Sequence, residues 1–298
     1  MGTAIQQAAV RHFAGGDALF SGLALLALAA GCGTVCRGGW KLRAARLIAV
    51  VGAVLVALSA VPLPIWFHVL GGTAGTAWLA SVGRSGRRRR IASAMLLLAW
   101  CAVGAGIEIA FRTRPALPGR TFSRLAVIGD SLSAGISPSN DGAWPARFAE
   151  ETGVEVIDLS SAGATTRSAI RPAERLDADD ALVLVEIGGN DLLAGRSSDE
   201  FGADLDRLLR SLVRPGRGIV MLELPLPPLH DGYGRRQRAL AAKYDAAVIP
   251  RRDLARVLFA NGATIDDLHL SEAGHAALAE MVRERLGGRL RSQDGRRP

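Results

Sequence analysis

Two long apolar runs near the start of this chain limit its fold more than any other feature. They span residues 18–36 and 91–110 and contain one charged residue between them, Glu108. A helix of about 20 apolar residues can cross roughly 30 Å of hydrocarbon. Two more apolar segments, residues 47–61 and 64–82, lie between the runs, separated by a stretch containing the helix breakers Pro62 and Pro64. The pattern predicts a transmembrane region of about four helices over residues 1–110.

Charge is divided unevenly along the chain. Residues 1–120 contain 13 Lys and Arg against 2 Asp and Glu, a net charge of +11. Residues 121–298 contain 23 Lys and Arg against 26 Asp and Glu, a net charge of −3. Cations beside apolar runs are typical of the cytoplasmic ends of membrane helices. We therefore expect no nucleic-acid partner, because the excess cations flank apolar runs and do not form a basic globular surface.

The cations between the apolar runs also predict a topology. They form two clusters, one of Arg37, Lys41, Arg43 and Arg46, and one of Arg84 with Arg87–Arg90. If both clusters face the cytoplasm, residues 47–83 must cross the membrane twice as a short helical hairpin, and residues 91–110 then lead outward. The opposing evidence is three cations on the outer side, Arg112, Arg114 and Arg120. We expect a multi-pass protein of the cell membrane, with its C-terminal part outside the cytoplasm.

Other interpretations of the apolar part are weaker. A cleaved secretory signal normally has a compact basic start, which the residues before Ala18 lack. Residues 29–32 resemble the end of a bacterial lipoprotein signal, but Ala29 stands where that pattern usually has a larger aliphatic residue. Glu108 could be a functional acid within the membrane, although a carboxylate one turn from the interface is more often solvated. The three cysteines all lie in the apolar part, so none can form a disulfide in the rest of the chain.

Beyond a linker at residues 111–120, which contains Pro115 and Pro118, short aliphatic runs alternate with amphipathic stretches. This alternation is typical of a βαβ architecture, and continuous Val, Ile and Leu content suits a parallel sheet covered on both faces. The expected strands are residues 125–128, 154–159, 181–187, 218–224 and 246–249. The expected helices are residues 143–151, 166–176, 198–213, 235–244 and 271–286, the last with Ser271 as its N-cap.

Chemically distinctive segments follow four of the predicted strands. Residues 129–131 (Gly-Asp-Ser) follow the first strand and residues 161–163 (Ser-Ala-Gly) the second. Residues 188–191 (Gly-Gly-Asn-Asp) follow the third, and residues 266–269 (Asp-Asp-Leu-His) follow the fifth. Ligands of parallel α/β sheets bind outside the carboxyl ends of the strands. We therefore expect these segments to converge on one edge of the sheet and to form a site.

Together the motifs resemble the SGNH (GDSL) hydrolase family, and within it the thioesterase/lysophospholipase-like esterases. The resemblance covers nearly all of residues 122–287. It implies a flavodoxin-like three-layer α/β domain over residues 121–290, preceded by the α-helical transmembrane region and followed by a flexible tail at 291–298. The motifs are Gly-Asp-Ser-Leu-Ser at 129–133, Trp-Pro at 144–145, Gly-Ala-Thr-Thr at 163–166, Glu-Ile-Gly-Gly-Asn-Asp at 186–191 and Asp-Asp-Leu-His at 266–269.

The resemblance assigns a role to each residue of the expected site. A serine hydroxyl is a poor nucleophile near neutral pH and needs a base and donors for the oxyanion. Ser131 would be the nucleophile, His269 the base and Asp266 the residue that orients the imidazole. The Asp-x-x-His spacing lets one short loop supply both partners. The oxyanion hole would consist of the Ser131 and Gly163 backbone N–H groups and the Asn190 side-chain amide. Gly163 suits this role because a residue without Cβ lets the backbone approach the substrate.

Neighbouring polar residues receive other interpretations. We expect Asp130 and Asp191 to fix loop geometry by hydrogen bonds, and His275 to lie at the surface. No His or Cys cluster completes a ligand set with Asp266, Asp267 and His269, so we expect no metal and no other cofactor. The sequence around Ser131 lacks the Gly-x-Ser-x-Gly elbow of α/β-hydrolases.

The sequence thus predicts a membrane-anchored serine ester hydrolase of esterase, lipase or thioesterase type that forms an acyl-serine intermediate. Its partners would be the lipid bilayer and an acyl ester, namely a lipid, a small ester or an acylated glycan. One alternative is transfer of the acyl group to a sugar hydroxyl, or deacetylation of a cell-envelope glycan, at the same site, because water and alcohols attack the same intermediate. A binding protein on a catalytically inactive fold is a second alternative, which the complete set of site residues opposes.

Overall fold

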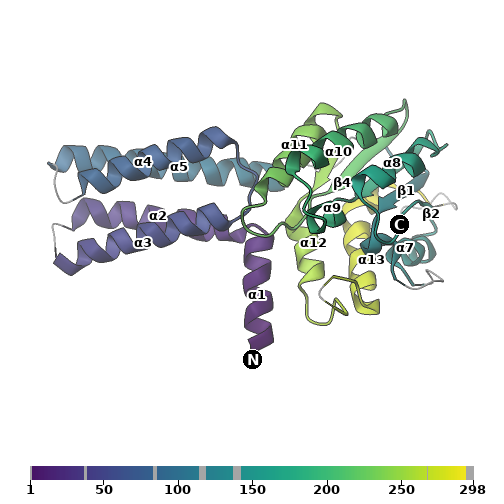
Figure 1. The fold of residues 1–298 in the computed structure, drawn as a ribbon, viewed down its shortest axis with the longest axis horizontal. Helices are drawn as coiled ribbons and strands as arrows, with labels where there is room; N and C mark the ends of the chain where they lie inside the picture. The colour runs from purple at the N-terminus through teal and green to yellow at the C-terminus, as the bar shows by residue number, and fades with distance from the viewer. Residues whose placement is uncertain are drawn as a thin grey trace. The chain divides into compact units, whose positions relative to one another are not determined.

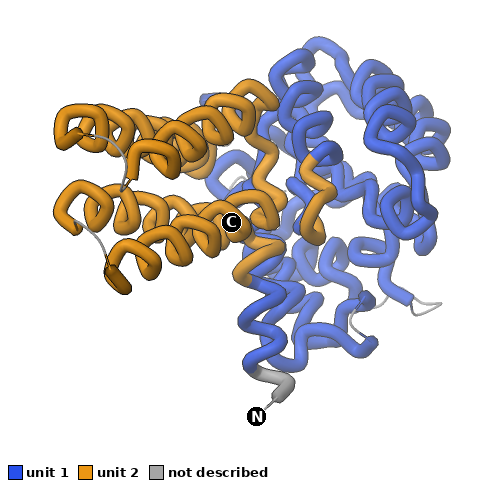
Figure 2. The backbone as a smooth tube through the Cα atoms, turned by 60° about the vertical axis from the view of Figure 1, so that its left-hand side comes forward, with its two compact units in different colours: residues 1–11, 115–225, 232–298 blue, residues 12–114, 226–231 orange. Residues whose placement is uncertain are grey.

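The computed structural model describes residues 2–36, 39–82, 86–113, 119–136, 142–266 and 268–292. The chain divides into two compact units (Figure 2). We call residues 12–114 and 226–231 the helical unit, and residues 1–11, 115–225 and 232–298 the sheet unit. Some of the residues named above lie outside the described ranges, namely Arg37, Arg84, Arg114, Asp267, both linker prolines and residues 293–298 of the predicted tail.

All four apolar segments of the helical unit are helices, as the sequence predicts (Figure 1). α2 packs against α3 and α5, and α4 packs against α5. By length and composition, α2 and α5 could each cross a membrane. α4 has only 17 residues, and α3 carries Lys41, Arg43 and Arg46 near its start. A shorter helix, α1 (Gly2–Ala14), precedes these four and is absent from the sequence prediction. The bounds are α2 (Asp17–Val35), α3 (Gly39–Leu58), α4 (Ile65–Ser81) and α5 (Arg87–Arg112).

Cations gather at one end of the helical unit. Arg46 near the start of α3 donates to Val82 O, just after the end of α4, at 2.8 Å. Arg90 near the start of α5 donates to Cys36 O, just after the end of α2, at 3.3 Å. These side chains satisfy carbonyl groups that helix ends leave unpaired. The basic starts of α3 and α5 therefore lie beside the ends of α4 and α2.

The opposite end of the helical unit holds an ion-pair cluster. Arg112 pairs with Asp17 at 2.9 Å and with Glu108 at 3.0 Å. Glu108 is buried, so the expectation that its carboxylate is solvated is wrong. The physical reason is that Arg112 lies four residues later on the same helix face and supplies the counter-charge that a buried carboxylate needs.

A pair of glycines lets α2 and α3 approach closely. A Cβ placed on Gly22 would lie 2.7 Å from Gly52 O, and one on Gly52 would lie 2.8 Å from Gly22 O. Close backbone contact through small residues is the usual means of packing apolar helices against one another in lipid.

In the part of the chain that the structure describes, the sheet unit contains five parallel strands in the order β2-β1-β3-β4-β5. This is the strand order of flavodoxin-like folds, so the predicted fold class is confirmed. The strands have short, nearly continuous apolar sequences, because both faces of a parallel sheet are covered. All five predicted strands are present, with bounds β1 (Arg124–Gly129), β2 (Glu155–Asp158), β3 (Ala181–Glu186), β4 (Gly218–Leu222) and β5 (Ala247–Ile249).

Helices cover both faces of the sheet (Figure 1). On one face, Leu125 and Val127 of β1 share a buried core with α7, α12 and α13. On the other face, α8 and α10 pack against each other. The five predicted helices correspond to α7 (Trp144–Thr152), α8 (Thr166–Glu174), α10 (Ser198–Leu212), α11 (Asp231–Lys243) and α13 (Glu272–Leu286). Elements absent from the prediction are α6 (Ser131–Ala134), α9 (Gly189–Leu193), α12 (Arg251–Leu258) and a 3₁₀ turn, Gly287–Arg289.

Backbone hydrogen bonds join the residues just before β1 to the residues just after α13. Phe122 N–H donates to Arg289 O at 2.8 Å, and Arg291 N–H donates to Phe122 O at 3.0 Å. The side chain of Phe122 belongs to the same buried core as Leu290. The segment just before β1 is therefore held in place by the segment just after α13.

The Gly22–Gly52 contact makes a prediction for stability. Gly22→Ala should lower the melting temperature of the full chain in detergent, because overpacking costs about 1–3 kcal/mol and exceeds the gain of up to about 1 kcal/mol in helix propensity. Gly31→Ala on the same helix is the matched control, because no atom lies within 4 Å of its added Cβ. Circular dichroism measures both. Equal melting temperatures for the two variants would contradict close packing at Gly22.

Candidate active site

Three of the predicted site segments meet at the carboxyl edge of the sheet. Ser131 begins α6 directly after β1, Gly163 lies in the loop after β2, and Asn190 lies in α9 after β3. The Asn190 side-chain Nδ2 donates to Ala164 O at 3.0 Å and to Asp130 Oδ2 at 3.4 Å. β1 and β3 flank the point where the strand order reverses, which is where ligands bind in folds of this kind. The expected convergence of these segments is confirmed.

A tight turn presents Ser131. Asp130 is the N-cap of α6, and its Oδ1 accepts the N–H of Leu132 at 3.0 Å. The carbonyl of Ser131 accepts the N–H of Gly135 at 3.0 Å. The side chain of Asp130 therefore holds the backbone just after Ser131, in line with the expectation that it fixes loop geometry.

A buried polar chain supports this turn from behind. The Ser133 hydroxyl donates to Glu186 Oε2 at 2.9 Å and accepts the Trp144 indole N–H at 3.1 Å. Glu186 Oε2 also accepts the N–H of Asp130 at 3.3 Å. A Cβ on Gly129 would collide with the Ser133 hydroxyl, so the turn needs glycine there. The sequence prediction missed the role of Ser133 and Glu186, although both belong to the quoted motifs.

The surroundings of Glu186 disfavour its charged form. It is 1% exposed, and its Oε1 has no hydrogen-bond partner among the residues that the structure describes. Burial raises the pKa of Glu186 well above its usual range, and the nearby Asp130 carboxylate raises it further. Burying a carboxylate without a counter-charge is costly, so this environment favours the protonated form of Glu186.

The pKa of Asp130 is also raised, but less than that of Glu186. Burial raises its pKa to about 6, and the charge of Asp191 acts in the same direction. The backbone N–H of Leu132 and the charge of His269 lower the pKa of Asp130. The loop that carries His269 leads into α13, and a Cβ on Gly135, the C-cap of α6, would lie 3.8 Å from Nε2 of His275 on α13.

Asp266 and His269 form a hydrogen-bonded pair on one loop. Asp266 Oδ2 contacts His269 Nδ1 at 2.8 Å, while Oδ1 accepts the N–H groups of His269 at 2.8 Å and Leu268 at 3.2 Å. The hydrogen bond from His269 and the backbone donors lower the pKa of Asp266 to about 2. An ionised carboxylate only accepts hydrogen bonds, so Nδ1 of His269 carries a proton and Nε2 is left as the basic nitrogen.

Backbone contacts clamp this loop to the start of α13. Thr264 and Leu270 form an antiparallel bridge, and Ile265 N–H donates to His269 O at 2.9 Å. Ser271 N–H donates to Ala263 O at 2.9 Å, and the Ser271 hydroxyl caps α13 as predicted, by accepting from the N–H of residue 274. These backbone contacts therefore fix the loop that carries Asp266 and His269. The side chains of both residues are partly exposed.

Gly163 adopts a backbone conformation that favours glycine. Its φ is +76°, in the left-handed region, and no atom lies within 4 Å of the place where a Cβ would be. The backbone at Gly163 therefore faces open space at the edge of the sheet. That a substrate approaches the main chain at this position stays a prediction.

The expectation that His275 lies at the surface is wrong. His275 is buried, and its Nδ1 accepts the backbone N–H of Trp144 at 3.4 Å. Burial lowers its pKa, with a smaller contribution from the nearby cation of Arg147. The reason is its place on the face of α13 that packs against α7, which the sequence around His275 alone does not reveal.

Comparison with known proteins identifies relatives of the sheet unit. Residues 127–277 match the GDSL-like Lipase/Acylhydrolase family. Esterase TesA of Pseudomonas aeruginosa is 29% identical over 138 residues, which cover 42% of this chain and 69% of the relative. An arylesterase of Vibrio mimicus is 34% identical over 120 residues, covering 38% of this chain and 58% of the relative. A crystal structure of TesA covers 55% of this chain and 97% of its own, with 28% identity and a TM-score of 0.49.

The raised pKa of Asp130 makes a prediction for stability against pH. The unfolded chain loses this proton near pH 4, whereas the folded chain keeps it until about pH 6, so Asp130 destabilises the fold as pH rises through this window. A difference of about two pKa units corresponds to about 3 kcal/mol. Asp130→Asn keeps the acceptor for Leu132 but removes this loss.

Thermal unfolding of both proteins from pH 4 to pH 8 measures the effect. The wild-type melting temperature should fall more steeply than that of Asp130→Asn between pH 4 and pH 7. Asp130→Asn also removes the carboxylate that raises the pKa of Glu186, so the difference between the two curves includes the coupling of the two acids. Parallel curves would show that Asp130 has an ordinary pKa.

Proposed function

Because the chain belongs to the GDSL-like lipase/acylhydrolase family and is therefore an ester-bond hydrolase, we propose that it acts through an acyl-serine intermediate on Ser131. The observation that carries the proposal is the Asp266–His269 pair. Its hydrogen bond leaves His269 Nε2 as a base, which we place within reach of Ser131 at the carboxyl edge of the sheet. Asp266 and His269 belong to one clamped loop, so the imidazole is already oriented before an ester binds.

The reaction then proceeds in two steps. Ser131 Oγ attacks the ester carbonyl while His269 Nε2 accepts the hydroxyl proton. The tetrahedral intermediate collapses, the alcohol leaves with the proton from His269, and the acyl group stays on Ser131. In the second step His269 takes a proton from water, the hydroxide attacks the acyl-serine, and the proton returns to Ser131 as the free acid leaves.

Three donors would hold the oxyanion, namely the N–H groups of Ser131 and Gly163 and the amide of Asn190. One N–H of the Asn190 side chain is anchored on Ala164 O at 3.0 Å, which fixes the amide plane. The other contact of Nδ2, to Asp130 Oδ2, is long at 3.4 Å and is weak enough for an oxyanion to replace it. Donors fixed in this way cost no reorganisation when negative charge develops.

We also propose that the helical unit anchors the enzyme in a membrane with several spans. Among the described residues, two helices, α2 and α5, are long and apolar enough to cross. Large apolar side chains point outward from the bundle instead of into it, among them Val69 and Leu70 of α4 and Met95 and Leu96 of α5. A helix that is apolar on its outer face needs an apolar surrounding, which lipid provides.

The charges of the helical unit support one orientation. Its basic end, with Lys41, Arg43, Arg46 and Arg87–Arg90, would face the cytoplasm. α5 starts at this end, so the chain leaves α5 at the opposite end, where Arg112 is neutralised by Asp17 and Glu108. The sheet unit would therefore lie outside the cytoplasm.

Replacement of the nucleophile tests the enzymatic proposal. Ser131→Ala should lower the turnover of p-nitrophenyl butyrate by the full chain in detergent by several powers of ten, as loss of a triad nucleophile does. Ser123→Ala, at the other end of β1, is the matched control and should keep wild-type turnover. Rapid acid quenching followed by intact-mass measurement should find a butyryl group on the wild type only. A tenth of the wild-type turnover in Ser131→Ala would exclude Ser131 as the nucleophile.

Protease access tests the orientation. In cells stripped of their outer barriers but with intact membranes, added protease should cut the sheet unit, because it lies outside the cytoplasm. A cytoplasmic protein measured in the same sample should stay intact and so serves as the control. Protection of the sheet unit until the membrane is lysed would mean that the topology is reversed.

A further inference from the structure

A buried acid, Asp191, ties together the two loops that carry the proposed oxyanion donors. Asp191 is 0% exposed and directly follows Asn190. Its Oδ2 accepts the backbone N–H of Thr166 at 2.7 Å and the Thr166 hydroxyl at 2.9 Å. Thr166 is the first residue of α8 and follows Gly163 by three positions. The two loops are thus joined twice, here and at the Asn190–Ala164 hydrogen bond.

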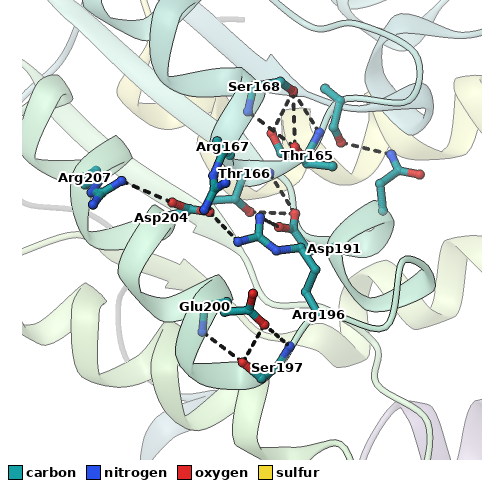
Figure 3. Close-up of polar contacts among 12 residues, drawn as sticks. Thr165, Thr166, Arg167, Ser168, Asp191, Arg196, Ser197, Glu200, Asp204 and Arg207 are labelled. Atoms are coloured by element: carbon teal, nitrogen blue, oxygen red, sulfur yellow. Dashed lines mark hydrogen bonds and ion pairs between the residues drawn. The ribbon is translucent and has the colours of Figure 1, made fainter.

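The buried charge of Asp191 needs a counter-charge, and Arg196 supplies it. Arg196 NH1 lies 3.1 Å from Asp191 Oδ1, with the Arg196 side chain 16% exposed (Figure 3). The main chain of Arg196 is also fixed, because its N–H donates to Asp191 O at 3.1 Å and its carbonyl accepts the Tyr233 hydroxyl at 2.6 Å. A buried carboxylate that loses its partner is strongly disfavoured, so the position of Asp191 depends on Arg196.

Asp204 of α10 holds Arg196 from the other side. Arg196 NH2 lies 2.7 Å from Asp204 Oδ2, and the Asp204 side chain is 2% exposed. Arg167 and Arg207 also contact Asp204, at 3.1 Å and 3.7 Å, but both side chains are 66% exposed (Figure 3). Among the described residues, Arg196 joins Asp191 to Asp204 by an ion pair with each, and it therefore links the segments that carry Gly163 and Asn190 to α10.

We propose that Arg196 is a positioning residue for the oxyanion hole, holding Asp191 on Thr166 and so setting the spacing between the Gly163 and Asn190 donors. Without its guanidinium, the Asp191 carboxylate must reach water or take up a proton, and either change weakens its hold on Thr166. Oxyanion donors act only when they are placed to within a fraction of an ångström. Loss of Arg196 should therefore weaken binding of the transition state while leaving substrate binding almost unchanged.

This inference rests on the proposed function and is tested by steady-state kinetics on the full chain in detergent with p-nitrophenyl butyrate. Arg196→Ala should lower kcat by on the order of 10-fold to 100-fold, less than complete loss of an oxyanion donor, with KM within about twofold of the wild type. Arg196→Lys keeps a cation beside Asp191 and should recover part of kcat. Arg207→Ala, which removes an exposed partner of the same Asp204, is the matched control and should keep wild-type kcat.

A double-mutant cycle separates positioning from a merely structural role. If Arg196 acts through the oxyanion hole, adding Arg196→Ala to Asn190→Ala should cost much less than it costs in the wild type. Multiplicative losses in kcat would overturn the proposal, and so would a folded Arg196→Ala with wild-type kcat. If Arg196→Ala does not fold, Asp204→Asn carries the same test, because it removes the group that holds Arg196. An unchanged kcat in a folded Asp204→Asn would then overturn the proposal.

Ser131→Ala, measured in parallel, distinguishes this inference from the function on which it rests. An active Ser131→Ala would show that the serine mechanism itself is wrong. An inactive Ser131→Ala beside a fully active Arg196→Ala would overturn only the positioning role of Arg196. The melting temperature of every variant is measured on the same sample, so that a lower kcat is compared only between folded proteins.

Discussion

Parallel pairing of β1 with β3 is the constraint on which the rest of the site depends. The two strands pair along their whole length, and the last pair joins Gly129 to Glu186. Two residues after Gly129 comes Ser131, and four residues after Glu186 comes Asn190. The register therefore brings the proposed nucleophile and the proposed oxyanion amide to one edge of the sheet. The same pairing leaves room only for a glycine at position 129, where the Ser133 hydroxyl and the Glu186 carboxyl meet the backbone.

The sheet unit buries two acids behind this edge in different ways. Among the described residues no cation pairs with Glu186, and burial raises its pKa, which favours the neutral form. Asp191 is equally buried but has Arg196 within 3.1 Å and two hydrogen bonds from Thr166. A neutral acid can brace the turn of Ser131 without placing a charge behind the nucleophile. A paired acid resists separation of its partners, which suits a group that joins two loops.

The helical unit is stabilised differently from the sheet unit, because its outer surface is apolar. Its helices approach through glycine, as at Gly22 and Gly52, and its cations satisfy the carbonyls at helix ends. The buried Glu108 is tolerated because Arg112 pairs with it and with Asp17. One end of the unit is therefore strongly basic, whereas the charges at the other end are largely neutralised. This asymmetry is what the proposed orientation in the membrane uses.

The sequence by itself determined the elements and the motifs. Alternating and continuous apolar patterns are local properties, so the five strands and the main helices could be predicted to within a few residues. The Asp-x-x-His spacing likewise placed Asp266 and His269 on one loop. Short elements such as α6 and α9 have too few residues to show a period, and these are the elements that hold Ser131 and Asn190. Tertiary structure alone decided which distant residues meet, including Glu186 with Ser133, Trp144 with His275, and Asp191 with Arg196 and Asp204. The charge state of a buried acid depends on these neighbours, because desolvation and counter-charges act through space and leave no local pattern along the chain.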